Sequence, residues 1–160
     1  MAAQFTPTFR ELARAEADAI LARNHVGRMA FVHERVDIEP IHYVYANGVI
    51  TCRTAWGTKL EALRHQHAVA FEVDEVEGPF DWRSVVVHGL AYIAEPTGSE
   101  HEERVYQESL AALRTLMPGA LEPGDPAPFR TVILRIHIDA VHGRAASTSA
   151  GPAAGPAADA

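Results

Sequence analysis

Residues 42–60 have the sequence HYVYANGVITCRTAWGTKL. The first part contains two runs rich in β-branched and aromatic residues, 42–46 and 49–53, separated only by Asn47-Gly48. Asparagine and glycine are the residues that most readily adopt the positive φ angles of a type I′ turn. The stretch therefore predicts a tight antiparallel hairpin.

The second part of this stretch predicts a turn at Gly57 that leads into a short helix. Thr58 and Glu61 have the spacing of a capping box, and the free N–H groups at the start of a helix attract anions. Together with the cations Arg53 and Lys59, these groups favour a phosphate site. The glycine and lysine spacing of a P-loop is absent from the sequence. On spacing alone, a plain capped helix with a solvated arginine and lysine explains the pattern better.

The remainder of the chain contains further helix and strand patterns. Helical spacing of apolar residues, with threonine or serine at each start, predicts helices over residues 8–23, 58–65 and 99–116. Runs rich in β-forming residues predict strands at 28–33, 42–46, 49–53, 68–73, 83–94 and 131–141. The acidic segment 74–81 is expected to be a solvated loop. About six strands with tight turns and flanking helices indicate an α+β fold built on an antiparallel barrel or half-barrel.

Composition and charge narrow the class of protein. The chain has 160 residues and a formal net charge of −7, which indicate one globular domain without a general affinity for nucleic acid. The single cysteine excludes an internal disulfide, and the first residues lack the pattern of a signal peptide. The apolar runs are too short to cross a membrane. We therefore expect a cytoplasmic protein that binds neither nucleic acid nor a membrane.

Residues 145–160 consist mainly of alanine, glycine, proline, serine and threonine. Such a segment cannot build a hydrophobic core, so it is expected to be a disordered tail that follows a domain of residues 1–144. Its deletion is accordingly predicted to change neither the fold nor the cofactor content.

Several stretches together resemble the pyridoxamine 5′-phosphate oxidase-like superfamily of FMN-binding split β-barrels. The most specific stretch is RTAWGTKL at 53–60, and the others are VGRMAF at 26–31, PIHYVY at 40–45, AFEVD at 70–74, WRSVVVHG at 82–89 and VHGR at 141–144. The similarity covers residues 8–144 and is greatest to the small branch that includes the nitroimidazole-resistance proteins. It implies a six-stranded antiparallel split barrel, flanked by helices, that forms a homodimer.

The resemblance also implies two FMN sites at the subunit interface. Positions that match Arg53, Thr54, Thr58 and Lys59 would hold the phosphate, and the isoalloxazine ring would lie along the strand that starts at Pro40. The expected flavin-binding residues are Pro40, Ile41, His42, Tyr43, Arg53, Thr54, Ala55, Thr58, Lys59, Trp82 and Ser84. The chain lacks the C-terminal tryptophan and arginine motif of true pyridoxamine-phosphate oxidases, so oxidation of vitamin B6 is not expected.

The function that this resemblance implies is an FMN-dependent oxidoreductase. The flavin would take a hydride from NAD(P)H and pass electrons to a small oxidised acceptor, such as a nitroaromatic compound or a quinone. Two alternatives stay open. One is a reductase of the same fold that uses the deazaflavin F420, and the other is a non-catalytic protein that binds flavin or haem.

The nine histidines and the cysteine are further candidates for functional groups. His65 and His67 could bind a metal or a haem iron, but histidines at a helix end more often complement the helix dipole. His42 could polarise a flavin carbonyl or simply pack, and Cys52 is expected to be a buried apolar residue. The sequence predicts no metal site and identifies no catalytic acid or base.

Overall fold

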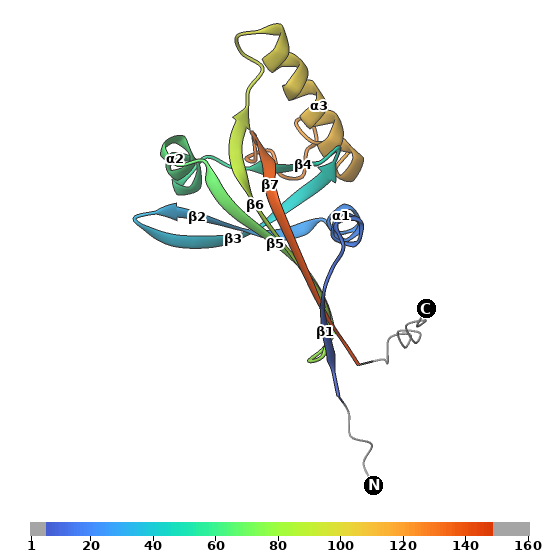
Figure 1. Cartoon of the computed structure of the whole chain (residues 1–160). Helices are drawn as coiled ribbons and strands as arrows, with labels where there is room; N and C mark the ends of the chain where they lie inside the picture. Colours follow the sequence, from blue (N-terminus) through green and yellow to red (C-terminus); the bar gives the residue numbers. More distant parts are fainter. Residues whose placement is uncertain (1–5, 149–160) are drawn as a thin grey trace, which may run out of the picture.

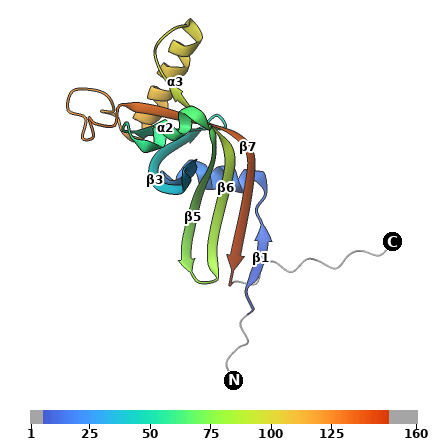
Figure 2. The same ribbon diagram turned by 90° about the vertical axis from the view of Figure 1, so that its left-hand side faces the viewer.

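The computed structural model describes residues 6–148, which form three helices and one seven-stranded antiparallel sheet (Figure 1). The elements are β1 (Thr8–Glu11), α1 (Arg14–Arg23), β2 (Val26–His33), β3 (Arg35–Ala46), β4 (Val49–Thr54), α2 (Thr58–His65), β5 (Ala68–Gly78), β6 (Asp81–Ala94), α3 (Glu100–Leu116) and β7 (Val132–Ser147). The strand order is β1-β7-β4-β3-β2-β5-β6, and a further pairing of β6 with β7 closes β2 to β7 into a barrel. β1 lies outside this ring, along the end of β7 (Figure 2). The α+β antiparallel barrel expected from the sequence is confirmed.

The β3–β4 hairpin forms around the predicted turn. Asn47 and Gly48 have φ angles of 52° and 73°, the positive values that a type I′ turn requires. Residues 46 and 49 pair directly, so two residues make the whole loop and fix the register of both strands. In that register Tyr43 pairs with Cys52, and both side chains are fully buried inside the barrel.

The barrel interior holds one continuous apolar cluster to which α1 contributes Ile20 and Leu21. Tyr43 and Phe71 meet edge to face at its centre, with ring centroids 4.9 Å apart, an arrangement that aromatic quadrupoles favour. The Tyr43 hydroxyl donates a hydrogen bond of 2.7 Å to the Leu21 carbonyl oxygen. This bond satisfies the one polar atom of a buried ring and ties α1 to β3.

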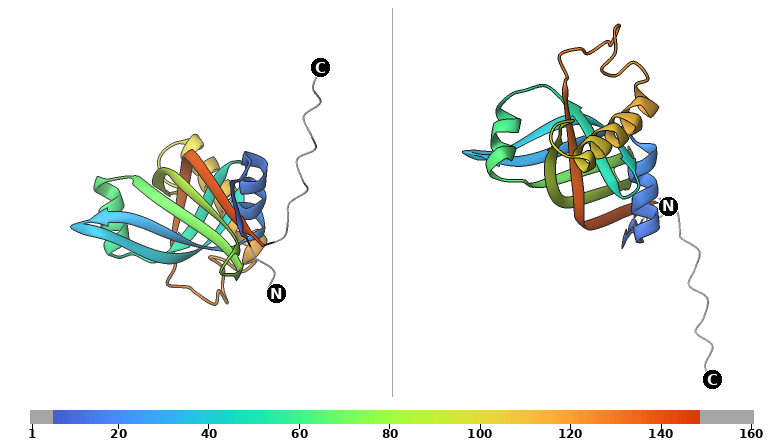
Figure 3. Two further views of the ribbon diagram at one scale, coloured as in Figure 1. Left: turned by 60° about the horizontal axis from the view of Figure 1, so that its bottom comes forward. Right: turned by 90° about the horizontal axis from the view of Figure 1, so that it is seen from above.

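α2 lies on the opposite side of the barrel from α1. Both views of Figure 3 show it beside the projecting β2–β3 hairpin. It spans the predicted residues and buries Leu60 and Leu63 in the barrel cluster. Because α2 follows β4 after only a short turn, its N-terminus lies close to the end of β4.

α3 packs on the outside of the barrel and forms a second, smaller cluster. Ser99 caps it as predicted: the Ser99 hydroxyl accepts from the Glu102 N–H at 3.2 Å, and the Glu102 carboxylate accepts from the Ser99 N–H at 2.9 Å. Leu113 then packs in a cluster with Ile133 of β7, while the neighbouring Leu134 faces the barrel interior. The start of β7 is therefore buried on both faces.

The first helix is shorter than the sequence pattern predicts. Residues 8–11 form β1 instead, and the helix begins at Arg14. Glu16, and not Glu11, supplies the capping carboxylate, which accepts from the Ala13 N–H at 2.9 Å. The cause is tertiary, because β1 pairs with residues 144–147 of β7, and a strand ladder outweighs a weak local preference for helix.

β5 runs through most of the segment that was expected to be an acidic loop. In it, Glu75 accepts two hydrogen bonds from the Arg23 guanidinium, at 2.6 and 2.7 Å, and one from the Asn24 amide at 2.7 Å. The Arg23 guanidinium is the main reason that the pKa of the Glu75 carboxyl is lowered to about 2. This carboxylate therefore joins β5 to the end of α1.

The Glu75 ion pair predicts a specific contribution to acid stability. Folding lowers the pKa of Glu75, so the pair stabilises the native state above pH 4.5 and is lost as the pH falls towards about 2. We expect Glu75→Gln to melt at a lower temperature than wild type at neutral pH, and the two melting temperatures to converge in acid. Circular dichroism melts test this, with the exposed Glu77→Gln as a control; a gap that does not narrow in acid contradicts it.

β7 continues past the domain boundary predicted at residue 144. Ala145 and Ala146 are only 6% and 2% exposed, because they lie between β1 and β6 and pair with both strands. Small side chains carry no pattern that reveals such burial from the sequence. The strand therefore extends the domain to Ser147, and residues 149–160 of the expected tail lie outside the described residues.

Deletion of residues 145–160 is now expected to destabilise the protein, contrary to the prediction from composition. The deletion removes two buried methyl groups and several ladder hydrogen bonds of β7, together worth about 2–3 kcal/mol. A fall in melting temperature of roughly 5–10 °C should follow. Deletion of residues 149–160 keeps all of β7 and is the matched control. Identical melting temperatures for the two truncations would show that the end of β7 contributes nothing.

Candidate functional site

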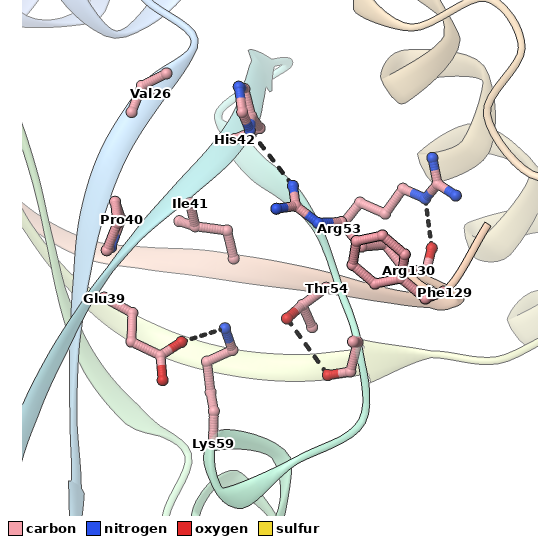
Figure 4. A pocket seen from close by; sticks show the side chains of 11 residues that line it. Val26, Glu39, Pro40, Ile41, His42, Arg53, Thr54, Lys59, Phe129 and Arg130 are labelled. Atoms are coloured by element: carbon pink, nitrogen blue, oxygen red, sulfur yellow. Dashed lines mark hydrogen bonds and ion pairs between the residues drawn. The ribbon is translucent and has the colours of Figure 1, made fainter. Parts of the chain in front are cut away.

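A cleft of about 350 Å³ opens where β3, the end of β4 and the start of α2 meet the loop that precedes β7 (Figure 4). The residues that line it are Val26, Glu39, Pro40, Ile41, His42, Arg53, Thr54, Ala55, Lys59, Phe129 and Arg130. The structure thus brings together seven of the residues expected to bind flavin: Pro40, Ile41, His42, Arg53, Thr54, Ala55 and Lys59. Four segments that are distant in the sequence contribute to one cavity.

The alternation of β3 determines which of its side chains reach the cleft. Pro40 and His42 are exposed towards it, whereas Tyr43 is fully buried on the other face of the strand. Burial raises the pKa of the Tyr43 phenol, whose hydroxyl is already bonded to α1. Tyr43 therefore belongs to the barrel core, away from the cleft where its neighbours lie.

Lys59, the only lysine of the chain, extends along the wall of the cleft (Figure 4). Its side chain is 10% exposed, and its Nζ atom lies 2.7 Å from Oε2 of Glu39. The side chain of Glu39 is much more exposed, at 46%. A ligand anion in the cleft could take the place of Glu39 beside this ammonium group.

The N-terminus of α2 opens beside Lys59. Gly57 is the N-cap residue, so the capping box expected between Thr58 and Glu61 does not form. The N–H groups of Leu60 and Glu61 bond to the Gly57 carbonyl oxygen, while the first N–H groups of a helix have no partner within it. Thr58 is exposed and lies outside the cleft lining. Glycine at the cap leaves the positive end of this helix free of a side-chain acceptor.

Arg53 lies in the cleft wall, but its guanidinium is turned away into the loop before β7. The guanidinium donates to both carboxylate oxygens of Asp125 and to the carbonyl oxygens of Ala127 and Arg130. The side chains of Arg53 and Asp125 are only 1% and 3% exposed. Hydrogen bonds from Arg53 hold the pKa of Asp125 well below its usual range. Nearly all the N–H donors of Arg53 are used inside the protein.

Phe129 and Arg130 complete the cleft, and the sequence patterns did not identify them. The Arg130 guanidinium points into the cavity, where Nη1 lies 3.5 Å from Nδ1 of His42 (Figure 4). The Phe129 ring is 64% exposed at the same edge. Both residues lie near the end of a loop rich in proline and glycine, and this loop contacts a strand more than 70 residues earlier.

Trp82 and Ser84 lie elsewhere, at the start of β6, where they pair with Ala146 and Arg144 of β7. Two shallow pockets of about 260 and 230 Å³ flank Trp82 on this part of the surface. The Ser84 hydroxyl donates a hydrogen bond of 3.1 Å to Glu72. Within one chain these two expected flavin contacts are therefore separate from the cleft.

The other candidate groups, the remaining histidines and Cys52, do not form a site in the part of the chain described. Among residues 6–148, no group of three or more His, Cys, Asp and Glu side chains could hold a metal ion. His67 stacks on Tyr92 with ring centroids 4.5 Å apart, and its Nδ1 lies 2.9 Å from the Ala91 carbonyl oxygen. Burial raises the pKa of the Cys52 thiol to about 12, which makes this thiol unreactive. None of the helices described is long and apolar enough to span a membrane.

Comparison with known proteins places this chain in a family. A FAD-binding protein of Mesorhizobium loti has a solved structure that matches with a TM-score of 0.66 and 26% identity, over 85% of this chain and 96% of that one. The FAD-binding protein of Mycobacterium smegmatis matches with a TM-score of 0.60 and 25% identity, over 84% and 98% of the two chains. A putative 5-nitroimidazole antibiotic resistance protein of Bacteroides thetaiotaomicron shares the fold, with a TM-score of 0.62 at 13% identity over 87% and 88% of the chains. The profile of the pyridoxamine 5′-phosphate oxidase family matches residues 13–145. The chain therefore belongs to the pyridoxamine 5′-phosphate oxidase family, as the stretch around Arg53 to Lys59 suggested.

Proposed function

We propose that this protein binds a flavin nucleotide and that the cleft beside Lys59 receives its phosphate. The observation that carries the proposal is the nearly buried Lys59 ammonium group at the open N-terminus of α2, with Arg130 in the same cleft. Two cations in the lining of one cavity, one of them in the first turn of a helix, favour a phosphoryl group as ligand. The hydroxyl of Thr54 adds a further polar contact in the cleft lining.

FMN is the flavin that we propose first, because the family resemblance implies it and because its terminal phosphate suits the cations in the cleft. FAD is the second candidate, since two of the similar structures are FAD-binding proteins. Both molecules carry a phosphoryl group at the end of the ribityl chain, so either could place this group beside Lys59. The isoalloxazine ring would then lie along β3 beside Pro40, as the family resemblance implies.

We propose that the protein works as a homodimer and that a second copy completes the flavin site. The cleft contains Pro40 and His42, whereas Trp82 and Ser84 lie on another part of the same chain. A partner could bring its Trp82 and Ser84 to the ring, as the family resemblance implies. Exposed β-branched residues on the strands, among them Val36 at 72% and Val76 at 67%, also favour an interface.

The dimer can be tested by sedimentation. At micromolar concentration we expect one species of about twice the 17.4 kDa mass of the chain, because exposed apolar strand faces are buried by association. The measurement should be made with and without added flavin, since a ligand at an interface strengthens association. A 17.4 kDa species alone under both conditions would contradict the dimer.

The proposed activity is the transfer of electrons from NAD(P)H to a small oxidised acceptor. The flavin supplies the hydride and electron chemistry when it is bound. The chain would hold the phosphate with Lys59 and orient the ring along β3. His42 and Arg130, which lie close together in the cleft, are the groups that could donate hydrogen bonds to the ligand.

The absorbance spectrum of the purified protein tests this function directly. A flavin gives a band near ~450 nm, F420 a band near ~420 nm and haem a Soret band, because these are properties of each cofactor. Mass analysis of the molecule released by denaturation then distinguishes FMN from FAD. A colourless protein that binds neither flavin in a titration would rule out the proposal.

A further inference from the structure

The loop between α3 and β7, residues 117–131, is built around the Arg53 side chain. Arg53 comes from β4, and its guanidinium bonds to Asp125, Ala127 and Arg130 at successive points along this loop. Its Nη2 atom donates to the Ala127 carbonyl oxygen at 2.9 Å, and its Nε donates to the carbonyl oxygen of Arg130. One buried side chain thus contacts three points of a segment that has no helix or strand of its own.

Asp125 holds the same loop from within. Its carboxylate accepts from the Leu121 N–H and the Ala127 N–H, each at 2.9 Å, in addition to the Arg53 guanidinium. Leu121 has a φ of 59° and Gly124 a φ of 91°, so the backbone turns sharply around this carboxylate. Buried charges are stable only when they are paired and hydrogen-bonded in this way.

The consequence for the cleft concerns Arg130. Arg53 fixes the backbone of Arg130 through its carbonyl oxygen, and the Arg130 guanidinium then points into the cavity beside His42 (Figure 4). Arg53 itself has almost no N–H donor left for a ligand. The cation available at this side of the cleft is therefore Arg130.

We propose that Arg53 and Asp125 form a positioning pair that presents the Arg130 guanidinium to the phosphate of the bound flavin. This inference rests on the proposed function, and it assigns Arg53 a different role from the direct phosphate contact that the family resemblance implies. Arg130 is the residue that touches the ligand. Arg53 and Asp125 act through it, by holding residues 117–131 in place.

Removal of the Asp125 charge changes FMN affinity in opposite directions, depending on whether Asp125 positions the loop or acts only through its charge. Asp125→Asn removes a negative charge near a site for an anion, so Coulomb attraction alone would strengthen FMN binding. An Arg53 guanidinium freed to turn towards the ligand would also strengthen it. Loss of positioning weakens FMN binding, by about tenfold for one charge-assisted hydrogen bond. The two mechanisms therefore predict opposite results.

The experiment is a set of fluorescence titrations with FMN and with riboflavin, which lacks the phosphate. The variants are Asp125→Asn, Arg130→Ala and the double variant, with Glu122→Gln as matched control, because Glu122 is in the same loop but pairs with Arg114. We expect Asp125→Asn and Arg130→Ala each to lose about tenfold in FMN affinity, with no further loss in the double variant. Riboflavin affinity should be unchanged in all variants. Glu122→Gln should bind FMN as tightly as wild type.

Several outcomes would overturn this inference without affecting the proposed function. These are tighter or equal FMN binding by Asp125→Asn, additive losses in the double variant, and equal losses for FMN and riboflavin, which indicate damage to the fold. If Asp125→Asn does not fold, Arg53→Lys takes its place in the experiment, because lysine keeps the charge but cannot bond to several points of the loop. Unchanged FMN affinity in Arg53→Lys would overturn the inference. Wild-type protein that binds FMN no better than riboflavin would instead overturn the phosphate site itself.

Discussion

Replacement of Arg53 by methionine is expected to lower the free energy of unfolding by about 3–5 kcal/mol, the usual cost of removing one partner of a buried ion pair. Methionine fills the space of the arginine stem but cannot bond to the loop. The Asp125 carboxylate would then stay buried without its guanidinium, and the carbonyl oxygens of Ala127 and Arg130 would lose their donors. Urea denaturation of wild type and variant measures the difference.

A surface arginine provides the control for this prediction. Arg10 pairs with Glu16 at 2.7 Å, but its side chain is 56% exposed, so Arg10→Met should leave stability almost unchanged. Arg53→Lys should fall between wild type and Arg53→Met, because it keeps the charge and loses the planar fork. Equal stability of Arg53→Met and Arg10→Met would show that the buried pair does not organise the loop before β7.

Elements encoded by neighbouring residues could be predicted from the sequence. Asn47-Gly48 determines its own turn through positive φ angles, and Ser99 caps its own helix through a hydrogen bond to the third residue that follows. α2 has the bounds that its helical spacing predicts. In each case the atoms that stabilise the element lie within a few residues of one another, so a short window of sequence contains the whole interaction.

Elements that depend on distant partners could not be predicted in this way. β1 exists because Thr8 pairs with Ser147, at the other end of the domain, and within its own window the segment resembles the start of a helix. Ala145 and Ala146 are buried because two strands flank them. Their composition alone suggested a tail, since the same small residues on an unpaired segment would bury nothing.

The sequence predicted the part of the candidate site that β3 and the start of α2 contribute. It did not predict the part that the loop before β7 contributes. Lys59 and Pro40 reach the cleft because their elements are regular and their direction follows from the strand and helix periods. Arg130 reaches it because a guanidinium from β4 fixes the loop. A side chain such as Arg53 can line a cleft and still direct its charge elsewhere, a distinction that no sequence pattern contains.

Lys59→Ala is expected to weaken FMN binding by about 1–3 kcal/mol, the worth of a charge-assisted hydrogen bond. This corresponds to a loss of roughly ten- to hundredfold in affinity. The Lys59 side chain is nearly buried and is the cation that α2 itself contributes to the cleft wall, so a phosphoryl group beside it would lose a counter-charge. Paired titrations with FMN and riboflavin measure the effect, and riboflavin should lose much less.

A substitution of Glu39 provides a control that should change FMN affinity in the opposite direction. Its carboxylate lies 2.7 Å from the Lys59 Nζ and competes with a phosphate for the same ammonium group, so Glu39→Gln should bind FMN more tightly than wild type. Because Lys59 is the only lysine, acylation with an amine reagent, followed by mass spectrometry, also reports on this site. FMN should slow the reaction at Lys59, whereas riboflavin should protect it much less.

Unchanged FMN affinity in Lys59→Ala would reject the phosphate site. A parallel loss for both ligands would instead mean that the substitution damaged the fold.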